Sequence, residues 1–378
     1  MAKAEGLAVL LTTTALTAAC IFPTLAAPSS RAKGTPDVRE TVLKLLEQRA
    51  FHSDQIDWPA ARRQLTQASS TDEADKIVTE LIARSTANHG HWIRTQAVPG
   101  AAEEKPRSAS SQQVRQRNAE ADPPGPTRGP EDANDPIGWI RVPPFLDNPS
   151  APRELTRQRR QAFAQMLQSW LRSEDQRPLC GWIVDLRQNG GGNMWPMLAG
   201  IAPLLSTDPK HREVIGAFVR GAEHQTWSVE SGQVLLGDRS PVSLDFPAYV
   251  LRHPAPPIAV LFGPRTASSG EALALAFRGR PATRSFGQKT AGYSTANVPT
   301  QLPDGSRLLL TVSVSVDRNL KGDGGKLEPD VVVSNAADAE QSARDWLLAQ
   351  RQCRAMASEP ERADPTTPAS EPKPFRST

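Results

Sequence analysis

Residues 266–271, with the sequence TASSGE, have the clearest potential for chemistry in the chain. They follow a short apolar run at 257–262 and precede small and apolar residues at 272–277 that are typical of a helix. A strand, a tight turn and a helix would place Ser268 at a helix N-terminus, where unpaired backbone N–H groups stabilise developing negative charge. The segment fits a nucleophilic serine. It also fits an ordinary N-cap with a glutamate in the first turn, and taken alone it favours that interpretation.

A glycine-rich turn follows another predicted strand. Residues 181–187 run into QNGGGN at 188–193, and a helix with Pro196 near its start comes next. The turn lacks the Gly-Lys-Ser/Thr ending of a phosphate-binding loop and does not match the dinucleotide fingerprint. Consecutive glycines such as Gly191 and Gly192 let a backbone approach a ligand closely and present N–H groups to an anion. The alternative is a tight turn with no ligand.

Two of the six histidines lie together in NHGHW, residues 88–92. A metal site is not expected, because no cluster of Cys, His or carboxylate residues supplies further ligands. Two surface histidines in a loop are one interpretation. The other is a general base, which needs a nucleophile supplied from elsewhere in the chain.

Periodicity and composition divide the chain. Helical patterns predict an N-terminal helical subdomain over residues 37–96, which carries the candidate base. Residues 97–136 have no period and are rich in Pro, Glu, Arg, Gln and Ser, so they predict a disordered linker or insertion. Strand and helix patterns over 137–352 imply an α/β core. Residues 355–378 predict a disordered tail.

Within the core, strands are predicted at 137–142, 181–187, 213–219 and 307–316, with a hairpin over 226–236 and helices over 163–171, 272–277 and 339–348.

The N-terminus predicts export. Lys3 precedes a mostly apolar stretch that ends in small residues near Ala27, so residues 1–27 are typical of a secretory signal peptide. A lipoprotein signal that ends at Cys20 is the alternative. No later stretch is long and apolar enough for a membrane span. We therefore expect a periplasmic or extracellular protein.

Charge and cysteine usage add two expectations. The net charge is +3 and the basic residues are scattered, which argues against a nucleic-acid partner. An oxidising compartment permits a disulfide between Cys180 and Cys353. The position of Cys180 before a buried-looking strand favours instead a small core residue.

Taken together, these segments resemble the tail-specific, or C-terminal processing, serine protease family. The resemblance covers about residues 37–95 and 137–333, and it implies a crotonase/ClpP-like α/β core behind the helical subdomain. No segment here is large enough for the peptide-binding PDZ module that many relatives carry. The landmarks, in order, are VDLRQNGGG at 184–192, TASSGE at 266–271, GQKTAG at 287–292, LPDG at 302–305 and PDV at 329–331.

The resemblance assigns roles around the serine. Ser268 becomes the nucleophile. The backbone N–H of Ser269, with that of Gly191 or Gly192, forms the oxyanion hole. One such donor is worth about 3–4 kcal/mol in comparable sites.

The base distinguishes two branches of the family. The processing proteases use a lysine, but Tyr293 occupies that position here, and Lys289 lies four residues early. The branch similar to the tricorn core protease uses a histidine from the helical region. The frame ELIARSTANHG at 80–90 matches that setting and assigns the base to His89, with His91 second. Counting back from Pro329 assigns the acidic orienting residue to Asp323, with Asp317 and Glu328 as alternatives.

The resulting hypothesis is a secreted serine endopeptidase that hydrolyses a peptide or protein substrate through an acyl-enzyme, with no cofactor. The alternative is a weak or inactive homologue that binds peptides or hydrophobic ligands, as the similar repeats of interphotoreceptor retinoid-binding protein do. A third hypothesis is an assembly protein that docks through residues 97–136 and the tail.

Overall fold

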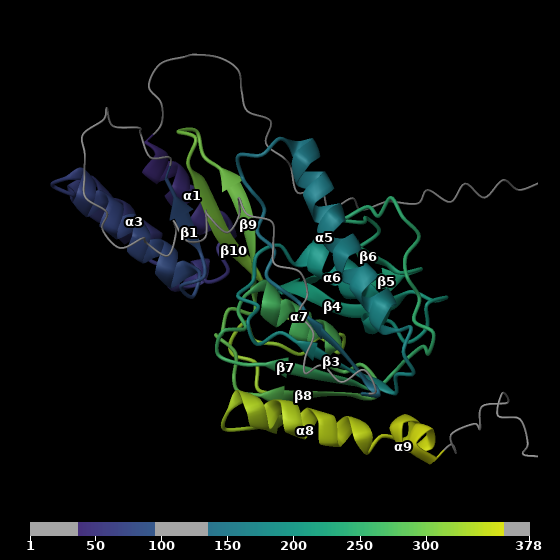
Figure 1. Ribbon diagram of the computed structural model, residues 1–378. Coiled ribbons are helices and arrows are strands. Elements are labelled where there is room, and N and C mark those ends of the chain that lie inside the picture. Colours follow the sequence, from purple (N-terminus) through teal and green to yellow (C-terminus); the bar gives the residue numbers. More distant parts are fainter. Residues whose placement is uncertain (1–36, 95–134, 359–378) are drawn as a thin grey trace, which may run out of the picture. The chain divides into compact units, whose positions relative to one another are not determined.

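A computed structural model describes residues 37–94 and 135–358 (Figure 1). The predicted signal peptide, most of the predicted linker and residues 359–378 lie outside the described residues. Helix α9, Arg351–Ser358, includes the first residues of the predicted tail. Within the described ranges, no helix has the length and apolar character that crossing a bilayer requires.

A parallel five-stranded sheet forms the base of the core, with strand order β11-β8-β7-β3-β2. Its central strands β3 and β7 are buried along their whole length, as expected for a parallel sheet covered on both faces. The predicted strands at 137–142 and 181–187 and the apolar run at 257–262 lie in this sheet. The predicted strands at 213–219 and 307–316 and the predicted hairpin over 226–236 lie in the second sheet. The strands of this sheet are β2 (Ile137–Arg141), β3 (Gly181–Asp185), β7 (Ile258–Phe262), β8 (Thr283–Gly287) and β11 (Val331–Val332).

Successive side chains of these strands point to opposite faces of the sheet, and different helices cover the two faces. Val184 and Val260 join the cluster formed with α5, α6 and α7, whereas Ile183 and Ala259 join the cluster formed with α8. Figure 1 shows α8 below β7 and β8, with α5, α6 and α7 above. The helices are α5 (Arg153–Glu174), α6 (Met194–Leu205), α7 (Ser269–Phe277) and α8 (Ala336–Leu348).

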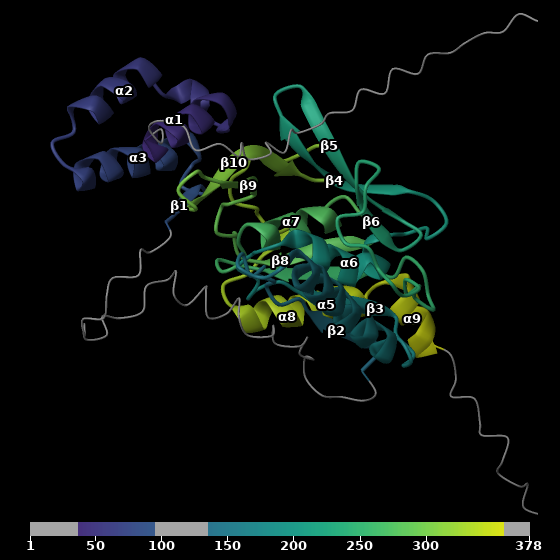
Figure 2. The same ribbon diagram turned by 90° about the horizontal axis from the view of Figure 1, so that it is seen from above.

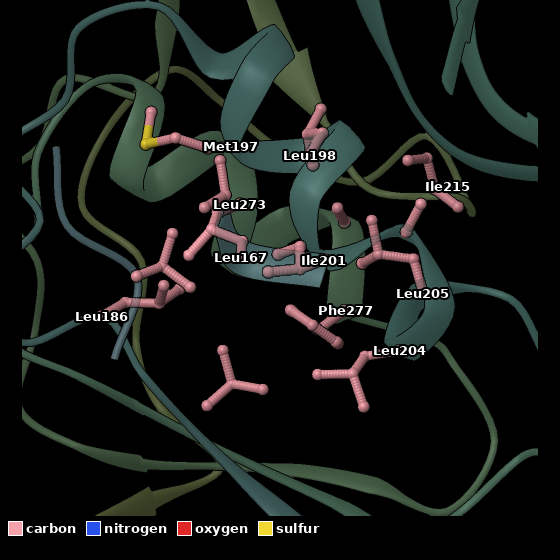
Figure 3. Close-up of a cluster of buried hydrophobic side chains, with 14 of the residues drawn as sticks. Leu167, Leu186, Met197, Leu198, Ile201, Leu204, Leu205, Ile215, Leu273 and Phe277 are labelled. Atoms are coloured by element: carbon pink, nitrogen blue, oxygen red, sulfur yellow. The ribbon is translucent and has the colours of Figure 1, made fainter. Parts of the chain in front are cut away.

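A second, antiparallel sheet covers the other side of α6 and α7. Its strand order is β1-β10-β4-β5-β6, and β9 pairs with β10. Ile215 of this sheet lies close to side chains of the apolar helix α6 in the main core (Figure 3), and Trp227 belongs to the same cluster. The strands are β1 (His91–Ile93), β4 (Glu213–Arg220), β5 (Glu223–Glu230), β6 (Gln233–Leu236), β9 (Thr295–Gln301) and β10 (Arg307–Val316).

The N-terminal helices attach to the long strand β10. Their apolar faces share one buried cluster with Leu302, Leu308 and Leu310. The short strand β1 then pairs with β10, with His91 opposite Leu309 (Figure 2). This attachment brings the segment that carries His89 to the core. The elements are α1 (Val38–Arg49), the 3-10 turn η1 (Ser53–Gln55), α2 (Trp58–Gln67) and α3 (Thr71–Ser85).

Cys180 and Cys353 form a disulfide, with their Cα atoms 4.8 Å apart. The permitted pairing is therefore correct, and the favoured interpretation of Cys180 as a reduced core residue is wrong, although both cysteines are buried. The bond joins the residue before β3 to helix α9, across 173 residues of sequence.

Loss of this disulfide should lower the free energy of unfolding by about 2–5 kcal/mol, because the cross-link restricts the unfolded chain. Urea unfolding of the Cys353→Ser variant, compared with the oxidised parent, measures the effect. Reduction should destabilise the parent and leave the Cys353→Ser variant unchanged. Equal stability of the parent and the variant under oxidising conditions would contradict the expectation.

Candidate active site

Ser268 lies at the turn between β7 and α7, directly before the first residue of the helix. The predicted strand, tight turn and helix are thereby confirmed. Ser268 has φ 53° and ψ −117°, a left-handed conformation that is strained for a residue with a side chain. The turn is fixed by hydrogen bonds from Gly270 N to Ala267 O and from Glu271 N to Ser268 O, both 2.9 Å. The side chain of Ser268 is thus carried on a sharply turned and well-anchored backbone.

His89 meets this serine from the N-terminal segment. Its Nε2 atom lies 3.1 Å from Ser268 Oγ, although the two residues are 179 positions apart. The imidazole is buried, with an exposed fraction of 8%. A nucleophile and an imidazole at hydrogen-bond distance form the arrangement that activates a serine by proton transfer.

The segment around His89 is built for close approach. Ala87 and Asn88 both have positive φ, so the chain turns sharply after α3. Gly90 has no room for a side chain, because a Cβ atom would lie 2.7 Å from Thr86 and 3.0 Å from the carbonyl of Leu309. The Asn297 amide of β9 donates to the carbonyl of His89 at 3.0 Å. Strands β9 and β10 therefore hold the imidazole segment in place.

A hydroxyl group stands at the second nitrogen of the imidazole. Thr295 Oγ1 lies 2.6 Å from His89 Nδ1, and Thr295 is buried at the start of β9. With Nδ1 protonated, the threonine oxygen accepts that proton and Nε2 is left to accept from Ser268. Thr295 is the site residue that sequence reasoning missed. It follows the GQKTAG landmark, but a single threonine in a polar segment gives no distinctive signal.

The three acidic residues considered as the orienting group have other partners. Asp323 is exposed, and its carboxylate accepts the Gly325 N–H at 2.9 Å. Asp317 is buried and accepts the N–H groups of Asn319 and Lys321, which fixes its own loop. Glu328 is paired with Lys289. The contact from Thr295 occupies the position that the sequence assigned to Asp323.

The glycine turn packs directly against the serine turn. A Cβ atom on Gly191 would lie 2.9 Å from Ser268 Cβ and 3.2 Å from Ser269 N. Both Gly191 and Gly192 have left-handed φ values, 104° and 115°. Only glycine adopts such values without strain.

Hydrogen bonds distinguish the three candidate oxyanion donors. Asn189 Oδ1 accepts the Gly191 N–H at 3.0 Å, so that N–H already has a partner within the turn. The Gly192 carbonyl accepts the Ser269 hydroxyl at 2.6 Å, which ties the two turns together. Ser269 is the first residue of α7, a position whose N–H has no acceptor inside a helix. Gly192 and Ser269 therefore remain as the candidate oxyanion donors beside Ser268.

Glu271 joins the serine turn to the loop that carries Tyr293. Its fully buried carboxylate accepts the N–H groups of Ser268 at 2.7 Å, Gly292 at 2.9 Å and Tyr293 at 2.8 Å, and the hydroxyl of Thr290 at 2.5 Å. Burial raises the pKa of Glu271, and these hydrogen bonds offset the rise only in part.

The alternative bases lie elsewhere. Lys289 is largely exposed and forms an ion pair with Glu328 on the surface. His91 is exposed on β1. Tyr293, at the position where the processing proteases have lysine, places its ring centroid 5.2 Å from that of His89. The tyrosine therefore forms a wall of the site beside the imidazole.

The described residues contain no group of three or more His, Cys, Asp or Glu side chains that could hold a metal ion. The contact between His89 and Ser268 can support proton transfer, and it lies beside the backbone N–H groups at the N-terminus of α7.

Comparisons with known proteins give consistent results. The model of peptidase family S41 matches residues 136–333. The nisin-resistance protein of Lactococcus lactis subsp. lactis is 32% identical over 213 residues, which is 56% of this chain and 60% of that protein. The match therefore spans less than two thirds of this relative's length.

Solved structures share the fold. A lipoprotein from Streptococcus agalactiae superposes with a TM-score of 0.62 and 25% identity, over 84% of this chain and 99% of that chain. The photosystem II D1 C-terminal processing protease superposes with a TM-score of 0.50 and 14% identity, over 84% and 97% of the two chains. The second likeness concerns the fold alone.

Proposed function

The chain belongs to peptidase family S41, and from this premise we propose that it is an exported serine endopeptidase with a histidine base. The observation that carries the proposal is the 3.1 Å contact between His89 Nε2 and Ser268 Oγ. A histidine base is the arrangement of the tricorn-like branch. Lys289, the candidate base of the other branch, instead forms a surface ion pair with Glu328.

The proposed reaction proceeds through an acyl-enzyme. Ser268 Oγ attacks the peptide carbonyl while His89 Nε2 takes its proton, and the imidazolium then protonates the leaving amine. The N–H groups of Ser269 and Gly192 stabilise the oxyanion, with Gly191 shaping the turn between them. Water, activated by the same imidazole, releases the acid product and restores Ser268.

Export is part of the proposal. One similar protein is described as a lipoprotein and another as a nisin-resistance protein, which supports a location outside the cytoplasm. A buried disulfide agrees with an oxidising compartment.

A fluorophosphonate probe tests the proposal directly, because it labels serines that are activated as nucleophiles. The intact protein should label at Ser268, identified by peptide mass spectrometry, and the Ser268→Ala variant should not. Cleavage is then followed with a set of quenched fluorescent peptides and with nisin, which is included because of the name of one relative. Absence of labelling together with absence of cleavage would favour the alternative, a homologue that binds peptides or hydrophobic ligands without cleaving them.

Thr295 provides a second prediction. The Thr295→Val variant removes the hydroxyl at His89 Nδ1 and should lower kcat/KM by about 10-fold to 100-fold, mainly through kcat, because hydrogen bonds to a charged group are worth about 1.5–3 kcal/mol. The Thr295→Ser variant keeps the hydroxyl and should recover most of the activity. An equal loss in both variants would contradict the role given to the hydroxyl, because Thr295→Ser keeps that group. Circular dichroism of both variants checks that the fold is retained.

A further inference from the structure

A groove of about 750 Å³ lies beside the candidate active site. It opens where β7, β8 and β11 end, at the carboxyl edge of the parallel sheet. This edge is where ligands bind in open α/β sheets. Its lining residues are Pro264, Gln288, Lys289, Thr290, Ala291, Tyr293, Lys326, Val332, Val333 and Ser334.

One wall of the groove is continuous with the catalytic turn. Ala291 N donates to Thr266 O at 3.0 Å, two residues before Ser268. Tyr293, which also lines the groove, lies against the His89 ring. A peptide bound at Ser268 would therefore have a direct path into the groove.

Another wall offers a strand edge with which no further strand of the described ranges pairs. β11 is the edge strand of the parallel sheet, and Val332 within it is 68% exposed. Extended peptides commonly bind by adding a strand to such an edge. An exposed valine on an edge strand suits an extended peptide with an apolar side chain.

The charge of the lining has one sign. Lys289 and Lys326 are its charged residues, and no carboxylate lines the groove. Lys289 is already paired with Glu328, whereas Lys326 forms no ion pair with any residue in the described ranges. The stem of Lys326 crosses Gly292, where a Cβ atom would lie 2.8 Å from Lys326 Cγ. Lys326 is exposed, so its ammonium group is accessible to a ligand in the groove.

We propose that this groove holds the substrate segment on one side of the scissile bond, and that Lys326 selects segments that carry a carboxylate. The inference rests on the proposed peptidase function. The carboxylate is supplied by an Asp or Glu side chain or by the free C-terminus of the peptide, and both present the same anion to an ammonium group.

Matched peptides test the proposal. Fluorescent decapeptides carry Glu, Gln or Lys at one position, which is moved along the chain, and each is made with a free or an amidated C-terminus. We expect kcat/KM to be about threefold to fivefold higher for the carboxylate form at one position or at the terminus, the size expected for an exposed ion pair. Loss of the preference on changing Glu to Gln assigns the side chain, and loss on amidation assigns the C-terminus.

Charge reversal supplies the decisive comparison. The Lys326→Glu variant should invert the preference, so that the Lys peptide is cleaved better than the Glu peptide. The Lys210→Glu variant makes the same charge change at an exposed residue outside the groove and should retain the original preference. A preference that is the same in the parent and in Lys326→Glu, or absent from the parent, would overturn the proposal.

A binding measurement separates this inference from the peptidase function. The affinities of the same peptides for the Ser268→Ala variant, with and without Lys326→Glu, are measured by fluorescence anisotropy. Carboxylate-dependent affinity that Lys326→Glu abolishes supports the groove even if no peptide is cleaved. Cleavage without any carboxylate preference in affinity or rate would instead leave the peptidase proposal intact and remove this one.

Discussion

Replacement of His89 by alanine should lower kcat/KM for peptide cleavage by about 10⁴-fold, because the variant loses both the base for attack and the acid for departure of the amine. Fluorophosphonate labelling of Ser268 should disappear with it. The Ser268→Ala variant should show a comparable loss, and the double variant should be little worse than either single one, since the two residues act as a unit.

Two matched variants make this result specific. His91→Ala removes a second histidine only two positions away, and Lys289→Ala removes the lysine that the other branch of the family would suggest. Both should keep activity close to that of the parent, because both side chains are exposed and Lys289 is paired with Glu328. The assignment of the base fails if Lys289→Ala abolishes labelling while His89→Ala retains it.

The Glu271→Ala variant should lose about 3 kcal/mol or more of unfolding free energy, together with most of its activity. The substitution leaves three backbone N–H groups without their acceptor in a buried place, and each such loss costs about 1–3 kcal/mol. Activity falls because the same carboxylate holds the backbone of Ser268 and of Tyr293. Urea unfolding and kcat measured on the folded fraction separate the two effects.

The control for Glu271 is Glu80→Ala, which removes an exposed glutamate from α3 and should change stability by less than about 0.5 kcal/mol. Glu271→Gln keeps the volume and one acceptor oxygen, so its stability should lie between that of the parent and that of Glu271→Ala. Equal stabilities for Glu271→Ala and Glu80→Ala would contradict the role given to these hydrogen bonds.

The difference in unfolding free energy between the parent and Glu271→Ala should depend on pH in one direction. Burial raises the pKa of Glu271 in the folded state above its value of about 4.5 in the unfolded chain. The folded protein then holds this proton over a pH range in which the unfolded chain has released it. The stabilisation that the protonated Glu271 contributes is complete below pH 4.5 and is lost as the pH rises through the pKa of the folded state. The stability difference between the parent and Glu271→Ala should therefore decrease as the pH rises.

The local parts of the fold follow from the sequence for clear physical reasons. The apolar run of β3 is followed by the glycines of the QNGGGN loop, so the sequence shows where this strand ends. Alternation of side chains predicts β10, which spans Arg307–Val316 as expected. By contrast, β9 contains Pro299 and several polar residues and has little strand character of its own. It forms by pairing with β10 at a sheet edge, where proline is tolerated.

The site divides in the same way. The turn at Ser268 is encoded within a few residues, and the family resemblance supplied His89 from a distant segment. The partner of Nδ1 depends on which side chain of β9 reaches the imidazole, and Thr295 lies 206 residues from His89. Counting along a loop to Asp323 could not anticipate that contact. The disulfide is equally non-local, since a buried cysteine before a strand gives the same pattern whether it is paired or not.

The disulfide also sets the topology of the covalent chain. Cys180 and Cys353 close the intervening polypeptide into a ring that contains Ser268, Ser269, Gly191 and Gly192, whereas His89 lies outside it. A single backbone cut inside the ring leaves both fragments linked until the bond is reduced. A cut between residues 94 and 135 would instead leave His89 joined to the serine by non-covalent contacts, which include the pairing of β1 with β10, the apolar contacts of the N-terminal helices and the hydrogen bonds from β9. The two halves of the candidate site thus differ in how they are tethered, one by covalent bonds and the other by packing.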